Sequence, residues 1–195
     1  MLELVISFES EDFNMNKQMG KLATLGGFGV LLLMAFYNFA RCLGELIGLG
    51  LPQIPFNSVI SGIMFLACAA GFGIAFLSEQ NIFDLAIAGG LGIYGVFTIF
   101  QYDLYMWFSV QTISVFSMIV IMIEIAAIIL WAMRFRQRSI LLTAAMSSVR
   151  LIIILVITPI LSSISLSAYY VGTYAASLII YGIYAFAAYL DYCEG

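Results

Sequence analysis

Histidine is absent from the 195-residue chain, and charged residues make up only 9% of it. The missing imidazole excludes haem ligation by histidine, Ser-His and Cys-His hydrolases, and most zinc chemistry. Soluble domains carry about 25% charged residues, whereas 64% of this chain is hydrophobic. The composition therefore predicts an integral membrane protein with a single membrane domain.

Basic residues are scarce as well. The chain has 7 Lys and Arg residues and 11 Asp and Glu residues. Without a basic surface, nucleic acid is excluded as a partner. The three cysteines, Cys42, Cys68 and Cys193, are far apart and form no CxxC motif. We expect them to be small buried or interfacial side chains, and we expect no disulfide, metal or cofactor.

Six long apolar runs are each near the length of about 20 residues that a spanning helix requires. None of them alternates apolar with polar residues, as the strands of a membrane barrel do. We therefore expect an all-α fold, a polytopic bundle of six transmembrane helices within residues 22–190. The expected spans are about 22–47, 57–77, 82–101, 108–133, 140–166 and 168–190.

The segments around these spans have their own signals. Residues 1–21 are acidic and predict a short cytoplasmic lead rather than a signal peptide, with the first helix entered at 14–16. Residues 191–195 are expected to form a cytoplasmic tail. The aromatic stretch 102–107 is expected to connect spans three and four at the interface. Pro159 is expected to kink the fifth span.

Basic residues outside the spans fall in two groups, Lys17 with Lys21 and the set Arg134, Arg136 and Arg138. Cytoplasmic loops collect Lys and Arg, so both groups are expected inside the cell. Four crossings separate them, and an even number is what a shared side requires. The sequence predicts six spans with both termini cytoplasmic, and the compact, loop-poor design favours the plasma membrane.

Two charges interrupt the middle of the apolar runs. Glu124 lies ten residues before Arg134, and Arg150 lies twelve residues after Arg138. At 1.5 Å per residue both lie about 15–18 Å from the boundary, near the middle of a core about 30 Å thick. Spans four and five should pack as an antiparallel hairpin, so we expect Glu124 and Arg150 to face each other. A structural ion pair and a ligand-binding site are equally compatible with this pattern.

Hydroxyl groups form a stripe on the last span. Its members follow at steps of four, three, four and three residues, which places them on one helix face: Tyr170, Tyr174, Ser177, Tyr181 and Tyr184. Hydrogen-bonded packing between helices is one interpretation. A polar lining for a cavity is the other, and it makes Tyr174 and Tyr181 candidate ligand-binding residues beside Glu124 and Arg150.

Arg41 and Glu45 are four residues apart near the outer end of the first span, a spacing that favours an ion pair. A stabilising pair at the interface is the simpler interpretation, and a charged vestibule at an external entrance is the alternative.

Three classes of function follow from this inventory. The first is a transporter or channel for a small solute or ion, or a substrate-binding membrane subunit, with a polar cavity between helices 4, 5 and 6. The alternative is a noncatalytic accessory or scaffold subunit of a larger membrane complex. An intramembrane enzyme is disfavoured because no carboxylate pair lies in one plane of the membrane. Expected partners are the lipid bilayer and either another membrane subunit or a second copy of the chain.

Overall fold

The computed structural model describes the backbone of residues 2–193 and the side chains of residues 15–193. These residues form helices and no strand, which confirms the all-α fold class. The elements are α1 (Leu2–Leu46), α2 (Asn57–Glu79), α3 (Ile82–Trp107), α4 (Val110–Ala132), the short helix η1 (Met133–Phe135), α5 (Ile140–Ile152), η2 (Ile153–Ile157), α6 (Thr158–Ile164) and α7 (Leu166–Cys193).

Six stretches of the described chain are long and apolar enough to cross a membrane. They are Met15–Leu46, Asn57–Glu79, Ile82–Trp107, Val110–Phe135, Ile140–Ile164 and Leu166–Cys193. The fifth combines α5, η2 and α6 into one continuous span. Six apolar helices of this length support a multi-pass integral membrane protein.

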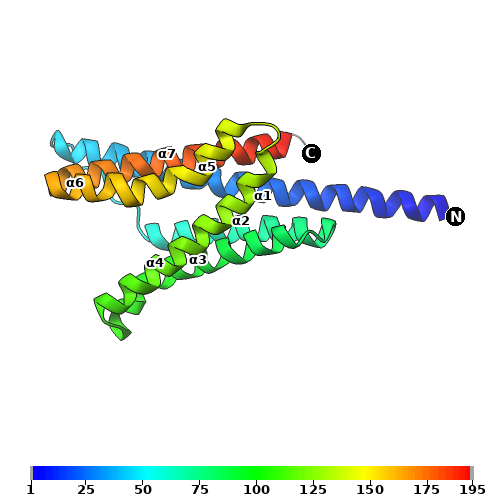
Figure 1. Ribbon diagram of the computed structural model, residues 1–195, viewed down its shortest axis with the longest axis horizontal. Coiled ribbons are helices and arrows are strands. Elements are labelled where there is room, and N and C mark those ends of the chain that lie inside the picture. Colours follow the sequence, from blue (N-terminus) through cyan, green and yellow to red (C-terminus); the bar gives the residue numbers. More distant parts are fainter. Residues whose placement is uncertain (1, 194–195) are drawn as a thin grey trace.

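The spans form a ring in which each helix packs on its neighbours in sequence. Helix α1 contacts both α2 and α7, and the chain of contacts continues from α2 to α3, α4 and α5 and from α5 to α7. Helix α4 crosses the bundle obliquely (Figure 1), with its C-terminal end beside α5 and its N-terminal end away from α6. Helix α4 therefore meets α5 only near their connection.

The two ends of the bundle differ in charge. One end, here called the charged end, holds the α2–α3 and α4–α5 connections and the end of α7 (Figure 1). Lys17 and Lys21 of α1 lie there too, because they pair with Glu79 and Asp191. The opposite end holds residues 47–56, the connection between α3 and α4, and the connection between α6 and α7. Both groups of basic residues thus lie at the same end, as an even number of crossings requires. Their cytoplasmic location stays a prediction.

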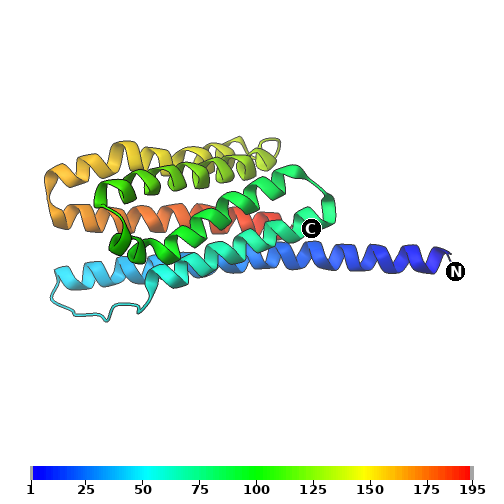
Figure 2. The same ribbon diagram turned by 90° about the horizontal axis from the view of Figure 1, so that it is seen from below.

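The first and third spans are longer than the sequence suggested. Helix α1 begins at Leu2 rather than at 14–16, and it extends beyond the other helices (Figure 2). The sequence has no Gly or Pro before Gly20, so no helix breaker interrupts its first turns. Stretch 102–107 is helical rather than a connection, because the break comes only at Phe108 and Ser109. Residues 1 and 194–195 of the expected lead and tail lie outside the described residues.

Pro159 is preceded by a local change of helix type. Residues Ile153–Ile157 form a π-helical turn, and the α-helix resumes at Thr158. Proline lacks an amide hydrogen and clashes with the carbonyl four residues earlier, so a widened turn relieves the clash. The Thr158 hydroxyl donates a hydrogen bond to the Ile153 carbonyl oxygen at 2.9 Å. The expected disturbance of the fifth span is thus a π-turn on the N-terminal side of the proline.

The contact between α1 and α2 depends on a glycine. A Cβ atom added at Gly71 would lie 2.5 Å from the Gly20 carbonyl oxygen and 3.1 Å from the Thr24 amide nitrogen. Backbone atoms cannot rotate away, so the helices would have to separate. We expect Gly71→Ala to lower the free energy of unfolding by about 1–3 kcal/mol.

Thermal unfolding in detergent, followed by circular dichroism, measures this loss. Gly73→Ala is the matched control, because a Cβ atom at Gly73 meets nothing within 4 Å. It lies on the same helix and is expected to unfold at the temperature of the parent protein or above it. Equal behaviour of the two variants would contradict the close approach of α1 and α2.

Candidate functional site: a buried ion pair between two polar pockets

The middle of the bundle contains the charge pair that the sequence predicted. The Arg150 Nε atom lies 2.7 Å from Glu124 Oε2, and these side chains are 11% and 0% exposed. Glu124 comes from α4 and Arg150 from α5, which pack on each other. The predicted pairing is confirmed, and both charges are removed from lipid.

Three tyrosines surround the pair. Arg150 Nη2 donates a hydrogen bond to the Tyr94 hydroxyl at 3.0 Å, and its guanidinium carbon lies 5.3 Å from the centre of the Tyr94 ring. Tyr181 and Tyr184 of α7 also interact electrostatically with Arg150. We call Glu124, Arg150 and these three tyrosines the central site. Tyr181, a candidate ligand-binding residue, lies on this side of α7, and its role in binding stays a prediction. Tyr94 was not predicted.

Several buried polar atoms near the central site have no hydrogen-bond partner among the described residues. They include Glu124 Oε1, the Tyr184 hydroxyl and Trp131 Nε1. Glu124, Tyr184 and Trp131 are each 0% exposed. A buried polar group left without a partner costs about 1–3 kcal/mol. The central site therefore has hydrogen-bonding capacity that the ion pair does not use.

Aromatic rings pack on both sides of Tyr184 and Tyr94. Phe28 of α1 stacks on Trp131 with ring centres 5.4 Å apart, and it contacts Tyr184 edge-on at 5.6 Å. Phe65 of α2 contacts Tyr94 at 4.6 Å. These rings pack against the tyrosines of the central site.

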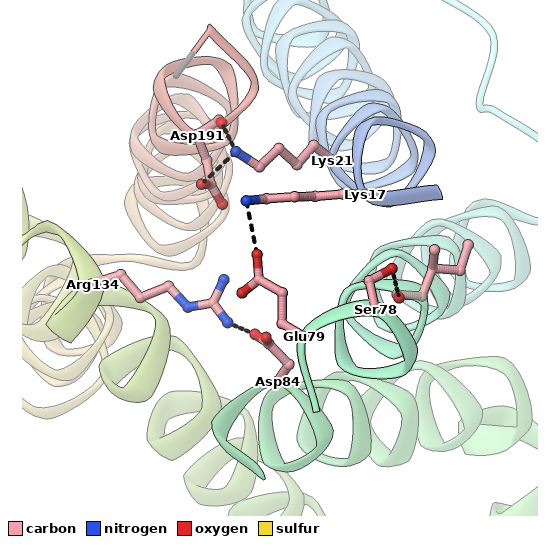
Figure 3. Close-up of polar contacts among 8 residues, drawn as sticks. Lys17, Lys21, Ser78, Glu79, Asp84, Arg134 and Asp191 are labelled. Carbon is pink, nitrogen blue, oxygen red and sulfur yellow. Dashed lines mark hydrogen bonds and ion pairs between the residues drawn. The ribbon is translucent and has the colours of Figure 1, made fainter. Parts of the chain in front are cut away.

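The charged end holds a network that sequence reasoning missed (Figure 3). Lys17 Nζ lies 2.8 Å from Glu79 Oε1, and Lys21 Nζ lies 2.6 Å from the Asp191 carbonyl oxygen. Arg134 forms an ion pair with Asp84, which is 0% exposed. The signal was available, because Asp84 begins the third span and Arg134 ends the fourth, so both lie at one end.

A pocket of about 380 Å³ opens within this network. We call it the charged-end pocket, and its wall comes from α1, α2, η1, α7 and the connections beside them. Its charged lining residues are Lys17, Lys21, Glu79, Arg134, Arg138 and Asp191. No group of three or more acidic or cysteine side chains in the described part of the chain is arranged to hold a metal ion.

The opposite end has two further pockets, which share Tyr174. One, of about 710 Å³, lies between the start of α2 and the end of α3 and is lined by Asn57 and Asp103 among others. The second, of about 370 Å³, is lined by Arg41 and Glu45. Arg41 Nε lies 3.4 Å from Glu45 Oε1, so this predicted pair is also confirmed.

Tyr174 therefore belongs to the opposite end and not to the central site. Seven residues separate it from Tyr181, which is about 10 Å along a helix. The sequence predicted a polar cavity between the fourth, fifth and sixth spans, which are α4, the stretch from α5 to α6, and α7. The packed ion pair occupies the centre of that region. Polar pockets lie instead at the two ends of the bundle, one on each side of that pair.

Comparisons with protein families, with curated proteins and with solved structures find no match to this chain.

Proposed function

We propose that this multi-pass membrane protein is a transporter or channel for a small solute or ion. The observation that carries this proposal is the buried Glu124–Arg150 pair, which lies between polar pockets at opposite ends of the bundle. The proposed path runs along the inner faces of α3, α4 and α7. Passage along this path would require the central site and its aromatic neighbours to move apart.

Energetics favour a functional role for the pair. Replacing a buried ion pair by apolar side chains of similar volume is often neutral or stabilising. In a membrane, ionisable residues within a span commonly mark a pathway for ions or substrates. A pair needed only for packing would not require Tyr94, Tyr181 and Tyr184 around it, together with buried polar atoms that have no partner.

Polar side chains also continue from the central site toward both ends. Trp131 on α4 and Arg134 on η1 follow Glu124 on the side of the charged-end pocket. On α7, Tyr181 is followed in the other direction by Tyr174, which lines the pockets of the opposite end. A solute that entered either pocket would meet polar groups up to the central site.

Aqueous access to α7 tests this proposal. In a variant with the three native cysteines replaced by alanine, we expect Tyr174→Cys and Tyr181→Cys to react with a small, charged thiol reagent. Tyr174→Cys should react faster, because position 181 becomes accessible only when the aromatic rings move apart. The reaction is measured in proteoliposomes by mass spectrometry of the labelled protein.

Ile179→Cys is the matched control, because Ile179 is on the same helix and 55% exposed on the outer surface of the bundle. Lipid would cover it, so a charged reagent should leave it unmodified. If Tyr181→Cys is as unreactive as Ile179→Cys, no aqueous path reaches the centre of the bundle. That result would favour the accessory-subunit alternative over transport.

A further inference from the structure

We propose that the central site takes up one proton and one monovalent anion together, with no change in its net charge. Glu124 receives the proton, and Arg150 then binds the anion in place of the carboxylate. This inference rests on the proposed transport function and names its substrate class. It follows from the composition of the site and from the cost of charge inside a membrane.

An ion pair of these two residues has no net charge. A charged Glu124 contributes one negative charge and Arg150 one positive charge, with 2.7 Å between Oε2 and Nε. The titratable groups that face the pair are Tyr94 on α3 and Tyr181 with Tyr184 on α7. The neighbouring residues of α1 and α2 are the apolar rings of Phe28 and Phe65. In the described part of the chain, therefore, one acid and one base determine the charge of the site.

Neutrality restricts what this site can bind. A proton on Glu124 alone would leave the Arg150 cation without a counter-charge in the middle of the membrane. An anion alone would give the site a net negative charge. Both states are unfavourable in a low dielectric. A proton and a monovalent anion that enter together keep the net charge at zero, so this combination avoids both penalties.

The donors needed by an anion are already present. Arg150 offers the Nε group that now contacts Glu124, and its Nη2 group is held by Tyr94. The Tyr184 hydroxyl is fully buried and has no hydrogen-bond partner among the described residues. An anion beside Arg150 would accept hydrogen bonds from Nε and from this hydroxyl. An arginine guanidinium is well suited to binding carboxylate and other oxyanions.

The cycle balances in protons and charge. A proton passes from water in one end pocket to a Glu124 oxygen, and the Glu124–Arg150 ion pair is replaced by an Arg150–anion pair. At the other end the anion leaves, the proton returns to water and the original ion pair forms again. No electrons are transferred, and no net charge crosses the membrane.

Isothermal titration calorimetry of the purified protein tests this proposal. Sodium chloride, nitrate and acetate are titrated in two buffers that differ in ionisation enthalpy, so the difference in heat gives the number of protons taken up. We expect at least one of the three anions to bind with uptake of one proton. Binding without proton uptake, or no binding of any of the three, would overturn the proposal. This count is made on the parent protein and requires no variant to fold.

Two variants identify the carboxylate that takes up the proton. Glu124→Gln is expected to bind the same anion without proton uptake, whereas Glu45→Gln, which removes a carboxylate at the opposite end, should retain uptake of one proton. Proton uptake that persists in Glu124→Gln would contradict the role of Glu124. If Glu124→Gln does not fold, Glu124→Asp retains the carboxylate and is expected to retain the coupled uptake, and its loss would count against the proposal.

Flux in proteoliposomes separates this inference from the proposed function. Anion entry accompanied by acidification of the lumen, at zero membrane potential, supports both. Anion flux that requires compensating charge movement and carries no proton would overturn the coupling and leave transport standing. Coupled binding without any flux would overturn transport and leave the proton–anion site standing.

Discussion

Reversing the charge of Glu124 or of Arg150 is expected to lower the free energy of unfolding by about 3–5 kcal/mol, and reversing both should restore most of that loss. Glu124→Arg places two cations in contact, and Arg150→Glu places two carboxylates in contact, both away from water. The double variant recreates an ion pair of opposite polarity. The Tyr94 hydroxyl, which now accepts from Arg150, can donate to the new carboxylate.

The measurements are the yield of monodisperse protein in detergent and its thermal unfolding. The pair Arg41–Glu45 is the matched control, because Glu45 is 52% exposed and the two residues are on one helix. Reversal of either charge there is expected to change stability by about 0.5 kcal/mol or less. A double variant at Glu124 and Arg150 that is no more stable than the single variants would refute their direct pairing.

Function then adds a second readout to the same variants. If the double variant folds and also transports, the pair contributes only to structure. If it folds without transport, the original polarity is required, which is what binding of an anion by Arg150 predicts.

Removing Arg134 is expected to destabilise the protein almost as much, by about 3–5 kcal/mol in Arg134→Ala. Its partner Asp84 is 0% exposed, and neither carboxylate oxygen has a hydrogen bond within the described residues. The ion pair with Arg134 is thus the main compensation for that buried charge. The guanidinium carbon also lies 5.6 Å from the centre of the Phe72 ring, and this packing would be lost as well.

Thermal unfolding again measures the effect. Arg136→Ala, in the same connection but exposed to solvent, should unfold like the parent protein. Combining Arg134→Leu with Asp84→Leu removes both charges and is expected to recover most of the stability that Arg134→Ala loses. If Arg134→Ala is as stable as Arg136→Ala, the buried carboxylate does not depend on this arginine.

The sequence predicted the features that depend on distance along the chain. Run lengths gave the six spans, and counting residues from Arg134 and Arg138 placed Glu124 and Arg150 at one depth. The short connection then made them neighbours. Arg41 and Glu45 were paired correctly for the same reason, because four residues are about one helical turn.

Features that depend on helix rotation were missed. Lipid-facing and packed sides of a membrane helix are equally apolar, so hydropathy does not show which way Tyr94 or Asp84 points. Asp84 and Arg134 lie at the same end of their spans, but the sequence does not show that the two side chains point toward each other. Tyr174 and Tyr181 share one face of α7, but that pattern does not separate a residue of the central site from one at the opposite end.

Solid-state NMR of the protein in lipid bilayers tests the central claim most directly, by measuring the dipolar coupling between ¹⁵Nε of Arg150 and ¹³Cδ of Glu124. The signals of Arg150 and Glu124 are identified by their absence from the spectra of the Arg150→Lys and Glu124→Gln variants. An ion pair with 2.7 Å between Nε and Oε2 predicts a strong coupling between these two nuclei in the membrane. A coupling too weak to detect would contradict the account, because the two charges would then not form the barrier between the polar ends of the bundle.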